Sequence, residues 1–207
     1  MVNRTTRRPG CQAGFRLAAG AESGYNEGVM LILTTPRLRL RPVQAGDYPA
    51  LRAMFCDPLT QRYESDRLSE ADALERFTRM CLDRDDPLQI RRRWIITLPP
   101  EDTPRGWVHL DLLEETAREY EIGWLVERGL WNQGCATEGA RAVLAFAFSE
   151  RKAHRVLAYC HADNAASERV MQKLGMTREG RLRQTRLLHG AYYDELLYAV
   201  LEDDPRR

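Results

Sequence analysis

A short segment between two regions of opposite pattern has the residue types of an anion-binding turn. Before it, YEIGWLV alternates like a β-strand, and after it the apolar side chains recur at helical spacing. The first turn of a helix has N–H groups without intrahelical partners and lies at the positive end of the helix dipole. A glycine there lets the backbone approach an anion closely. This pattern predicts a pyrophosphate cradle, with an ordinary strand–helix turn as the alternative, at Gln133, Gly134, Cys135, Ala136 and Thr137.

A second polar group follows the strongly apolar strand HRVLAYCH. Asn164 stands immediately before a short helical segment that runs from about Ala165 to Leu174. An asparagine in this place is a favoured helix N-cap, and Ser167 has the spacing of a first-turn residue. Gly175 suits the position just after the helix, where a left-handed backbone is common.

The elements that would position these two segments can be predicted from periodicity. Residues 38–41, LRLR, indicate a half-buried strand, and two amphipathic helices follow. Asp47 is the expected N-cap of the first helix, and Ser69 with Asp72 opens the second like a capping box. Three strands form an antiparallel meander: RRRWIITL, RGWVHLDLL and YEIGWLV. A long helix from about 137 to 151, the strand HRVLAYCH, the short helix and two strands meeting at His189-Gly190 complete an α+β (mixed α/β) sheet.

Composition excludes some classes of function. The chain has 207 residues, and 31 Lys+Arg against 30 Asp+Glu leave a net charge of +1, which gives no general reason to expect binding to nucleic acid or to a membrane surface. No apolar run approaches the roughly 20 residues of a transmembrane helix. Five cysteines without C-x-x-C spacing argue against disulfides and a metal site, and favour reduced thiols in a cytoplasmic protein. Cys135 is expected to be a small apolar filler rather than a nucleophile.

The first 29 residues differ from the rest of the chain. They are rich in Arg, Gly and Ala, show no sustained periodicity and lack the apolar region of a signal peptide. We therefore expect a disordered N-terminal extension at 1–29, a folded domain at 30–203 and a short tail at 204–207. Met30 could be an alternative start, and an arginine-rich arm that touches RNA is the functional alternative for the extension.

The two polar segments resemble motifs of the GNAT superfamily of N-acetyltransferases. Members have a Q/R-x-x-G-x-G/A turn before their main helix, then N-x-x-S or N-x-x-A, then K-x-G-F. This chain has W-N-Q-G-C-A-T-E around Gly134, N-A-A-S from Asn164 and K-L-G-M from Lys173. The first string is similar to the W-G-Q-G-Y-A-T-E of the Rim-type branch, the ribosomal-protein-alanine N-acetyltransferases. The opening TPRLRLRP and the closing GAYYDELLY are also similar, so the resemblance covers about residues 33–201.

The resemblance implies acetyl-CoA as the cosubstrate and a central, mostly antiparallel, splayed β-sheet flanked by helices. The pantetheine arm would pair with strand backbone at Leu125 and Val126, next to Trp124, in a V-shaped opening between two strands. The pyrophosphate would meet the N–H groups of the predicted cradle. Asn164 would hydrogen-bond the cofactor arm, a role compatible with capping. Dimers are common in this family, so a homodimer is one assembly that the resemblance implies.

Acetylation of an amine requires that the amine lose a proton and that the departing thiolate gain one. The resemblance implies direct transfer without a covalent enzyme intermediate. Glu121 is the candidate proton acceptor, with a solvated strand-face carboxylate as the alternative. Burial would raise its pKa from the ordinary value of about 4.3 and make it a better base. Ser167 is the candidate proton donor, with helix capping as the alternative; many superfamily members use a Tyr where this chain has Met171.

One departure from the Rim-type pattern affects the mechanism. Some relatives have a glutamate proposed as the base where this chain has Arg186, and His109, Asp111 or Tyr193 could supply a substitute. The acceptor is expected to be a primary amine, either a protein N-terminus or a small molecule, and the arginines of RRRW suggest an acidic or phosphate-bearing one. The alternative function is a non-catalytic acetyl-CoA-binding or interaction module with the same fold.

Overall fold

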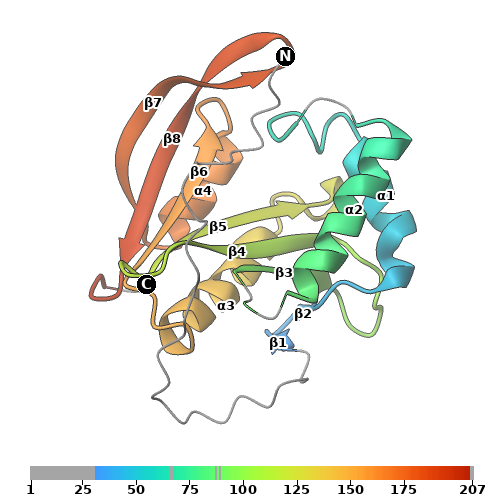
Figure 1. Cartoon of the computed structure of the whole chain (residues 1–207), viewed down its shortest axis with the longest axis horizontal. Coiled ribbons are helices and arrows are strands. Elements are labelled where there is room, and N and C mark those ends of the chain that lie inside the picture. The colour runs from blue at the N-terminus through green and yellow to red at the C-terminus, as the bar shows by residue number, and fades with distance from the viewer. Residues whose placement is uncertain (1–30, 66–67, 87, 89, 206–207) are drawn as a thin grey trace.

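The computed structural model describes residues 31–65, 68–86, 88 and 90–205, so the predicted extension at 1–29 lies outside the described residues. Its central feature is one eight-stranded sheet with the strand order β1-β2-β3-β4-β5-β6-β8-β7 (Figure 1). The strands are β1 (Leu33–Thr34), β2 (Arg39–Arg41), β3 (Arg91–Thr97), β4 (Gly106–Glu114), β5 (Glu119–Val126), β6 (Arg155–His161), β7 (Thr177–Leu188) and β8 (Ala191–Leu201). The helices are α1 (Tyr48–Cys56), α2 (Glu70–Arg84), α3 (Cys135–Ser149) and α4 (Ala165–Lys173), with short 3-10 turns η1 (Ala45–Asp47) and η2 (Arg128–Leu130).

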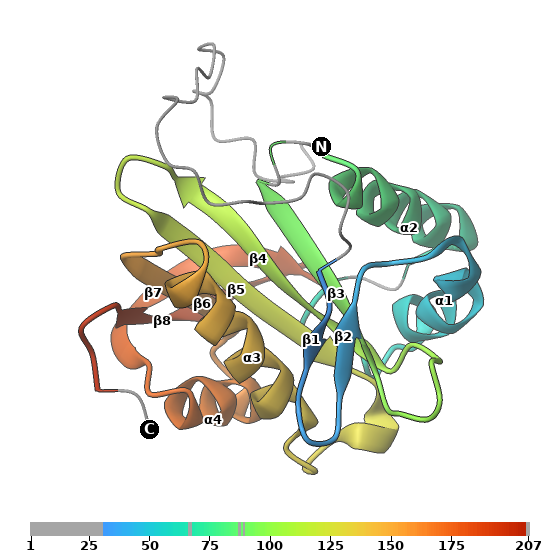
Figure 2. The same ribbon diagram turned by 90° about the horizontal axis from the view of Figure 1, so that it is seen from below.

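Helices cover the sheet on both faces (Figure 2). We call the face under α1 and α2 the front face and the face under α3 and α4 the back face. The front core joins apolar residues of α1 and α2 to Ile95, Trp107 and Leu125 of the sheet. The larger back core packs α3 and α4 on the alternate strand residues, among them Val108 and Ile122. The predicted mixed α/β architecture with a mostly antiparallel sheet is confirmed.

The sheet divides between β5 and β6, which form the one parallel pair in the described part of the chain. They pair only from Glu119 to Glu121 on β5 and from Arg155 to Leu157 on β6. Beyond these residues β5 pairs with β4 alone and β6 pairs with β8 alone. The two strands therefore diverge toward their carboxyl ends, as Figure 1 shows, and the predicted splay is present. We call the space between the diverging ends the gap.

Of the helix caps predicted for the first two helices, the structure confirms that of the second and contradicts that of the first. The capping box of Ser69 with Asp72 opens α2 as predicted. The prediction that the Asp47 side chain caps α1 is wrong, because Asp47 stands at the N-cap position but makes no side-chain cap bond there. Its carboxylate instead accepts from both terminal nitrogens of Arg41 at 2.8 Å, and Arg41 is only 2% exposed. A buried guanidinium requires a paired carboxylate, and that need overrides the local cap.

The elements around the predicted cradle differ from expectation by small shifts. The long helix α3 begins at Cys135, two residues before the predicted start at Thr137, so the glycine turn leads directly into it. Gly175 follows α4 with φ +81°, as a residue just beyond a helix end should. No helix among the described residues is long and apolar enough to cross a membrane.

Candidate active site

The predicted cradle lies at the start of α3. Gly134 occupies the N-cap position with φ +80°, a left-handed conformation that strains any residue with a Cβ. No side chain caps this end of the helix. The first-turn N–H groups, which include those of Ala136 and Thr137, therefore have no intrahelical partner. The turn offers unpaired donors at the positive end of the helix dipole, which fits a phosphate-bearing ligand.

A cation that sequence reasoning missed stands beside the cradle. Arg37, in the turn between β1 and β2, donates to the backbone carbonyl of Gln133 at 3.0 Å. Its Nη2 lies 3.5 Å from the position where a Cβ on Gly134 would be. Arg37 also pairs with Glu138 of α3 at 2.6 Å, and Thr35 donates to the same carboxylate at 2.6 Å. These bonds fix the helix start against the β1–β2 turn and place the guanidinium of Arg37 beside Gly134.

The edge of β5 determines which backbone groups face the gap. The Glu127 N–H donates to the Arg105 carbonyl beside β4 at 2.9 Å, whereas the Val126 carbonyl accepts from the Trp131 indole on the other side at 2.9 Å. Because alternate residues of an antiparallel strand bond to the same neighbour, Trp124 and Val126 direct their N–H groups toward the gap. Leu125 directs its backbone toward β4. Trp124 and Val126 therefore present backbone groups to the gap, whereas Leu125 contributes an apolar side chain to the front core. The pantetheine contacts of Leu125 and Val126 stay a prediction.

The second motif lies at the start of α4, immediately after the end of β6. The Asn164 Oδ1 accepts from the Ser167 N–H at 3.1 Å, so the predicted N-cap is confirmed. This bond uses the amide oxygen and leaves the side-chain NH₂ as a donor for a ligand. Met171, at the position of the tyrosine in many relatives, is fully buried. Neither the cofactor contact of Asn164 nor the acid role of Ser167 is tested by this geometry, and both stay predictions.

Cys135 behaves as the sequence suggested. The side chain is buried against the back core with 2% exposure. Burial raises the pKa of its thiol, so the thiol form dominates near neutral pH. The described cysteines are all free, and no group of three or more His, Cys, Asp or Glu side chains among the described residues could hold a metal ion.

The predicted proton acceptor Glu121 lies at the last paired position before the gap. Its cross-strand partners are Asp111 on β4 and Leu157 on β6. Because side chains alternate along a strand, these residues share the front face with Trp107 and Leu125. Asp111 and Glu121 are thus cross-strand partners at the narrow end of the gap. Burial raises the pKa of the Asp111 carboxyl. The base role of Glu121 stays a prediction.

His109 is a packed residue rather than a substitute base. Its imidazole lies directly on Gly123, where an added Cβ would stand 2.3 Å from the ring carbon Cε1. Burial, with the positive charges of Arg93, Arg76 and Arg91, lowers the pKa of His109 to about 3. A group with this pKa is neutral and a weak proton acceptor near pH 7.

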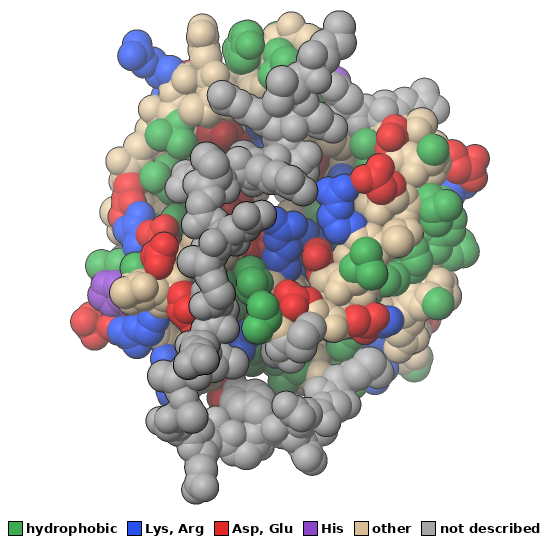
Figure 3. Space-filling view, in the orientation of Figure 1, with side chains coloured by type: hydrophobic (Ala, Val, Ile, Leu, Met, Phe, Trp, Pro, Cys, Tyr) green, Lys and Arg blue, Asp and Glu red, His purple; other side chains and the backbone are tan. Residues whose placement is uncertain are grey.

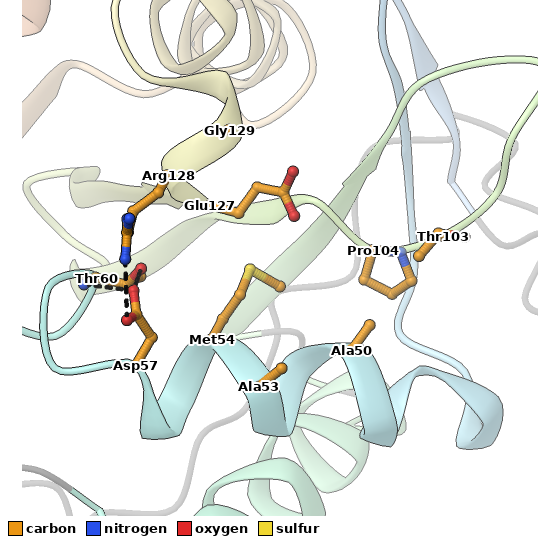
Figure 4. Close-up of a pocket in the computed structure, with 10 residues that line it drawn as sticks. All are labelled: Ala50, Ala53, Met54, Asp57, Thr60, Thr103, Pro104, Glu127, Arg128 and Gly129. Carbon is orange, nitrogen blue, oxygen red and sulfur yellow. Dashed lines mark hydrogen bonds and ion pairs between the residues drawn. The ribbon is translucent and has the colours of Figure 1, made fainter.

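A pocket of about 430 Å³ opens between α1, the β3–β4 connection and η2 (Figure 4). The side chain of Met54 points into it from α1, and Arg128 pairs with Asp57 across one end at 3.8 Å. None of the residues predicted from the sequence as catalytic or cofactor-binding lines this pocket. The candidate site is therefore the cradle and the gap, which α3, α4 and β5 position together.

Comparison with known proteins decides the family. A model described as the acetyltransferase (GNAT) domain matches residues 37–177. The chain belongs to the GNAT acetyltransferase family. It is 30% identical over 173 residues to the uncharacterized N-acetyltransferase YnaD of Bacillus subtilis (strain 168), an alignment that covers 83% of this chain and 98% of YnaD.

Solved GNAT structures share the fold. An acetyltransferase (GNAT family) from Bacillus anthracis is 28% identical, with a TM-score of 0.74 over 84% of this chain and 100% of that one. RimL, a ribosomal L7/L12 α-N-protein acetyltransferase solved with coenzyme A, is 20% identical, with a TM-score of 0.72 over 83% of this chain and 98% of that one. At 20% identity, the similarity to RimL shows that the two proteins share a fold. GNAT acetyltransferases as a family depend on acetyl-CoA, and the uncapped start of α3 beside Arg37 fits that cosubstrate.

Proposed function

We propose that this GNAT protein transfers the acetyl group of acetyl-CoA directly to a primary amine. The observation that carries the proposal is the cradle: Gly134 in a left-handed conformation, an uncapped helix start and the guanidinium of Arg37 at one point. Such a site suits a pyrophosphate. The divergence of β5 from β6 leads from this cradle along an unpaired strand edge, which suits an extended pantetheine arm.

The residues of the gap supply the parts that acetyl transfer needs. The N–H groups of Trp124 and Val126 would hold the pantetheine arm and the carbonyl oxygen on which negative charge develops. The Asn164 NH₂ would hold the arm from the other side of the gap. Ser167, one turn into α4, would give a proton to the departing thiolate. Glu121 is the sequence-derived candidate for the proton acceptor.

The acceptor proposed is the free amino terminus of a peptide or protein. Two relatives support this class: RimL acetylates the amino terminus of a ribosomal protein by its description, and the ribosomal-protein-serine acetyltransferase of Escherichia coli (strain K12) is 28% identical over 103 residues, which are 50% of this chain and 58% of that one. A small-molecule amine is the other acceptor class for which the same chemistry would serve.

Calorimetric titration with acetyl-CoA tests the cradle. Gly134→Glu introduces a Cβ in a left-handed position and a negative charge beside the pyrophosphate, so binding should be lost. Gly46→Glu is the matched control, because Gly46 is exposed and an added Cβ would meet no atom within 4 Å. We expect saturable heat for the wild type and for the control only. Equal affinity in all three proteins would refute the cradle assignment.

Release of free thiol separates an enzyme from a non-catalytic module. The proposal predicts that coenzyme A thiol appears only when an amine acceptor is present, because water is a poor competitor for a bound amine. Binding of acetyl-CoA without thiol release, across peptide and small-molecule amines, would favour the non-catalytic acetyl-CoA-binding module instead.

A further inference from the structure

We propose that Glu64, on the segment between α1 and α2, accepts the proton that the acceptor amine loses, a role that rests on the proposed acetyl transfer. The charged residues that surround it come from three separate elements. On the face of the molecule seen in Figure 3, basic and acidic side chains lie side by side. We call this group the front cluster. It consists of Glu64, Arg76 of α2, Arg186 of β7 and Glu195 of β8.

The segment that carries Glu64 lies between α2, which covers the β5 side of the gap, and the end of β6. On the β5 side, the Arg76 guanidinium lies 5.5 Å from the ring centre of Trp107, and Trp107 pairs with Leu125 of β5. On the β6 side, the ring of Tyr63 stands 4.9 Å from that of His161, the last residue of β6. Glu64 follows Tyr63 directly and interacts electrostatically with Arg76. Its backbone therefore lies between α2 and the carboxyl end of β6, the end at which the gap is wide.

Arg186 anchors this segment. Its Nη2 donates to the backbone carbonyl of Glu64, and its Nη1 pairs with Glu195 at 3.3 Å. Tyr193, the cross-strand partner of Arg186, stacks on His161 with ring centres 4.4 Å apart. Arg186 of β7, held by Glu195 of β8, thus fixes the backbone at Glu64.

The two carboxylates of the front cluster differ in what they bind. Glu195 is occupied, since it pairs with Arg186 and accepts from the Thr185 hydroxyl at 3.1 Å. Among the residues that the structure describes, the Glu64 carboxylate makes no hydrogen bond or ion pair of its own. Burial raises its pKa, the positive charges of Arg186 and Arg76 oppose that rise, and the charge of Glu195 adds to it. A partly exposed carboxylate that makes no hydrogen bond or ion pair within the described residues is open to an entering amine, and a raised pKa makes it a better proton acceptor.

The cluster adjoins the residues proposed to act on the thiolate. The Asn164 N–H donates to the His161 carbonyl at 2.8 Å, so the start of α4 with Ser167 follows immediately after the residue on which Tyr63 and Tyr193 stack. A proton acceptor and a proton donor thus stand at the same end of β6. This arrangement suits an amine that enters over the front face while acetyl-CoA lies along β5.

The acceptor ammonium gives one proton to the Glu64 carboxylate, and the free amine nitrogen attacks the thioester carbonyl carbon. The new C–N bond forms as the C–S bond breaks. The second proton lost by nitrogen ends on the thiolate of coenzyme A, through Ser167 in the proposed mechanism. Glu64 then releases its proton to solvent and is ready for the next acceptor.

Steady-state kinetics of Glu64→Gln test the assignment, with a lysine-free peptide that has a free amino-terminal serine as the probe. We expect kcat to fall about 100- to 10,000-fold, as for the loss of a general base, while KM for acetyl-CoA stays unchanged. In the wild type, kcat should rise with pH through the pKa of a carboxyl above its ordinary value, and this limb should vanish in the variant. Glu64→Asp, which keeps a carboxylate, should recover part of the rate.

Two comparisons make the test specific. Glu75→Gln, at an exposed glutamate of α2 that pairs with Arg79, should leave kcat unchanged. The melting temperature of Glu64→Gln at pH 7 should equal or exceed that of the wild type, because a carboxyl with a raised pKa is less stable ionised in the folded protein than in the unfolded chain. A kcat loss that comes with a lower melting temperature would indicate a structural role and overturn the proposal.

Other outcomes separate this proposal from the function on which it rests. If Glu64→Gln keeps the wild-type rate and pH limb while Glu121→Gln loses both, the base is Glu121 and the proposal is wrong. If the wild type acetylates neither the peptide nor a small-molecule amine, the proposed transfer itself fails, and the role of Glu64 fails with it.

Discussion

Single residues of the site combine local structure with ligand chemistry. Asn164 closes the start of α4 through its amide oxygen, and its NH₂ group is the donor proposed to hold the cofactor arm. Gly134 is required by its backbone, because φ +80° suits a glycine. His109 is held neutral by its surroundings. Each of these residues can be tested without knowing the acceptor.

Two substitutions separate the roles of Asn164. Asn164→Ala removes the cap and the amide donor, so it should cost about 1 kcal/mol of stability and weaken acetyl-CoA binding. Asn164→Asp should retain the cap, because aspartate caps helices about as well as asparagine, but lose the amide donor. Urea unfolding and calorimetry measure the two effects. If Asn164→Asp binds acetyl-CoA like the wild type, the amide does not contact the cofactor.

The imidazole of His109 should not titrate in the range typical of histidine. Its pKa of about 3 in the folded protein lies below the unfolded value of about 6.5, so the folded state binds fewer protons. Stability from this group is therefore present above about pH 6.5 and is lost as the pH falls toward 3. NMR should show constant His109 ring shifts between about pH 8 and pH 5. A midpoint near 6.5 would contradict the burial described for this ring.

At the scale of elements, the divergence of β5 from β6 organises the site. α3 begins at the carboxyl end of one strand, and α4 begins at the carboxyl end of the other. The gap therefore receives the start of a helix from each side. The front helices α1 and α2 are held to the sheet by the front core and by the buried pair of Arg41 with Asp47.

The buried pair should matter far more than an exposed one. Asp47→Ala leaves the Arg41 guanidinium buried with only Asp102 as an ionic partner, so about 3 kcal/mol of stability should be lost. Asp85→Ala removes the partner of Arg84 at a site where Asp85 is 60% exposed, and should cost little stability because solvent screens the pair. Urea denaturation of both variants measures the difference. Equal losses would show that the Asp102 contact suffices for Arg41.

Elements and local caps followed from the sequence because they depend on near neighbours. The Ser69 capping box, the Asn164 cap and the turn at Gly134 are set by residues a few positions apart. The role of Asp47 could not be predicted in this way, because its carboxylate pairs with Arg41 on the preceding strand instead of capping α1. Motif resemblance also supplied the family, which periodicity alone would not have shown.

At the scale of the whole molecule, the two halves of the site lie on different parts of the fold. The cradle stands at the start of α3, and the front cluster joins the α1–α2 segment and α2 to β7 and β8. Contacts that complete them join residues far apart in sequence: Arg37 and Glu138 are 101 positions apart, and Arg186 and Glu64 are 122 apart. No local pattern reports such pairings, and for this reason Arg37 and Glu64 were not among the predicted site residues.

The most direct test of direct acetyl transfer measures both products in one reaction. The full chain is incubated with acetyl-CoA and the lysine-free serine peptide, and samples are analysed for acetylated peptide by mass spectrometry and for free coenzyme A thiol. Direct transfer predicts equal amounts of the two products at every time, no acetyl group retained on the protein, and neither product with Gly134→Glu. Thiol release without acetylated peptide, or an acetylated protein that forms before the peptide product, would contradict it.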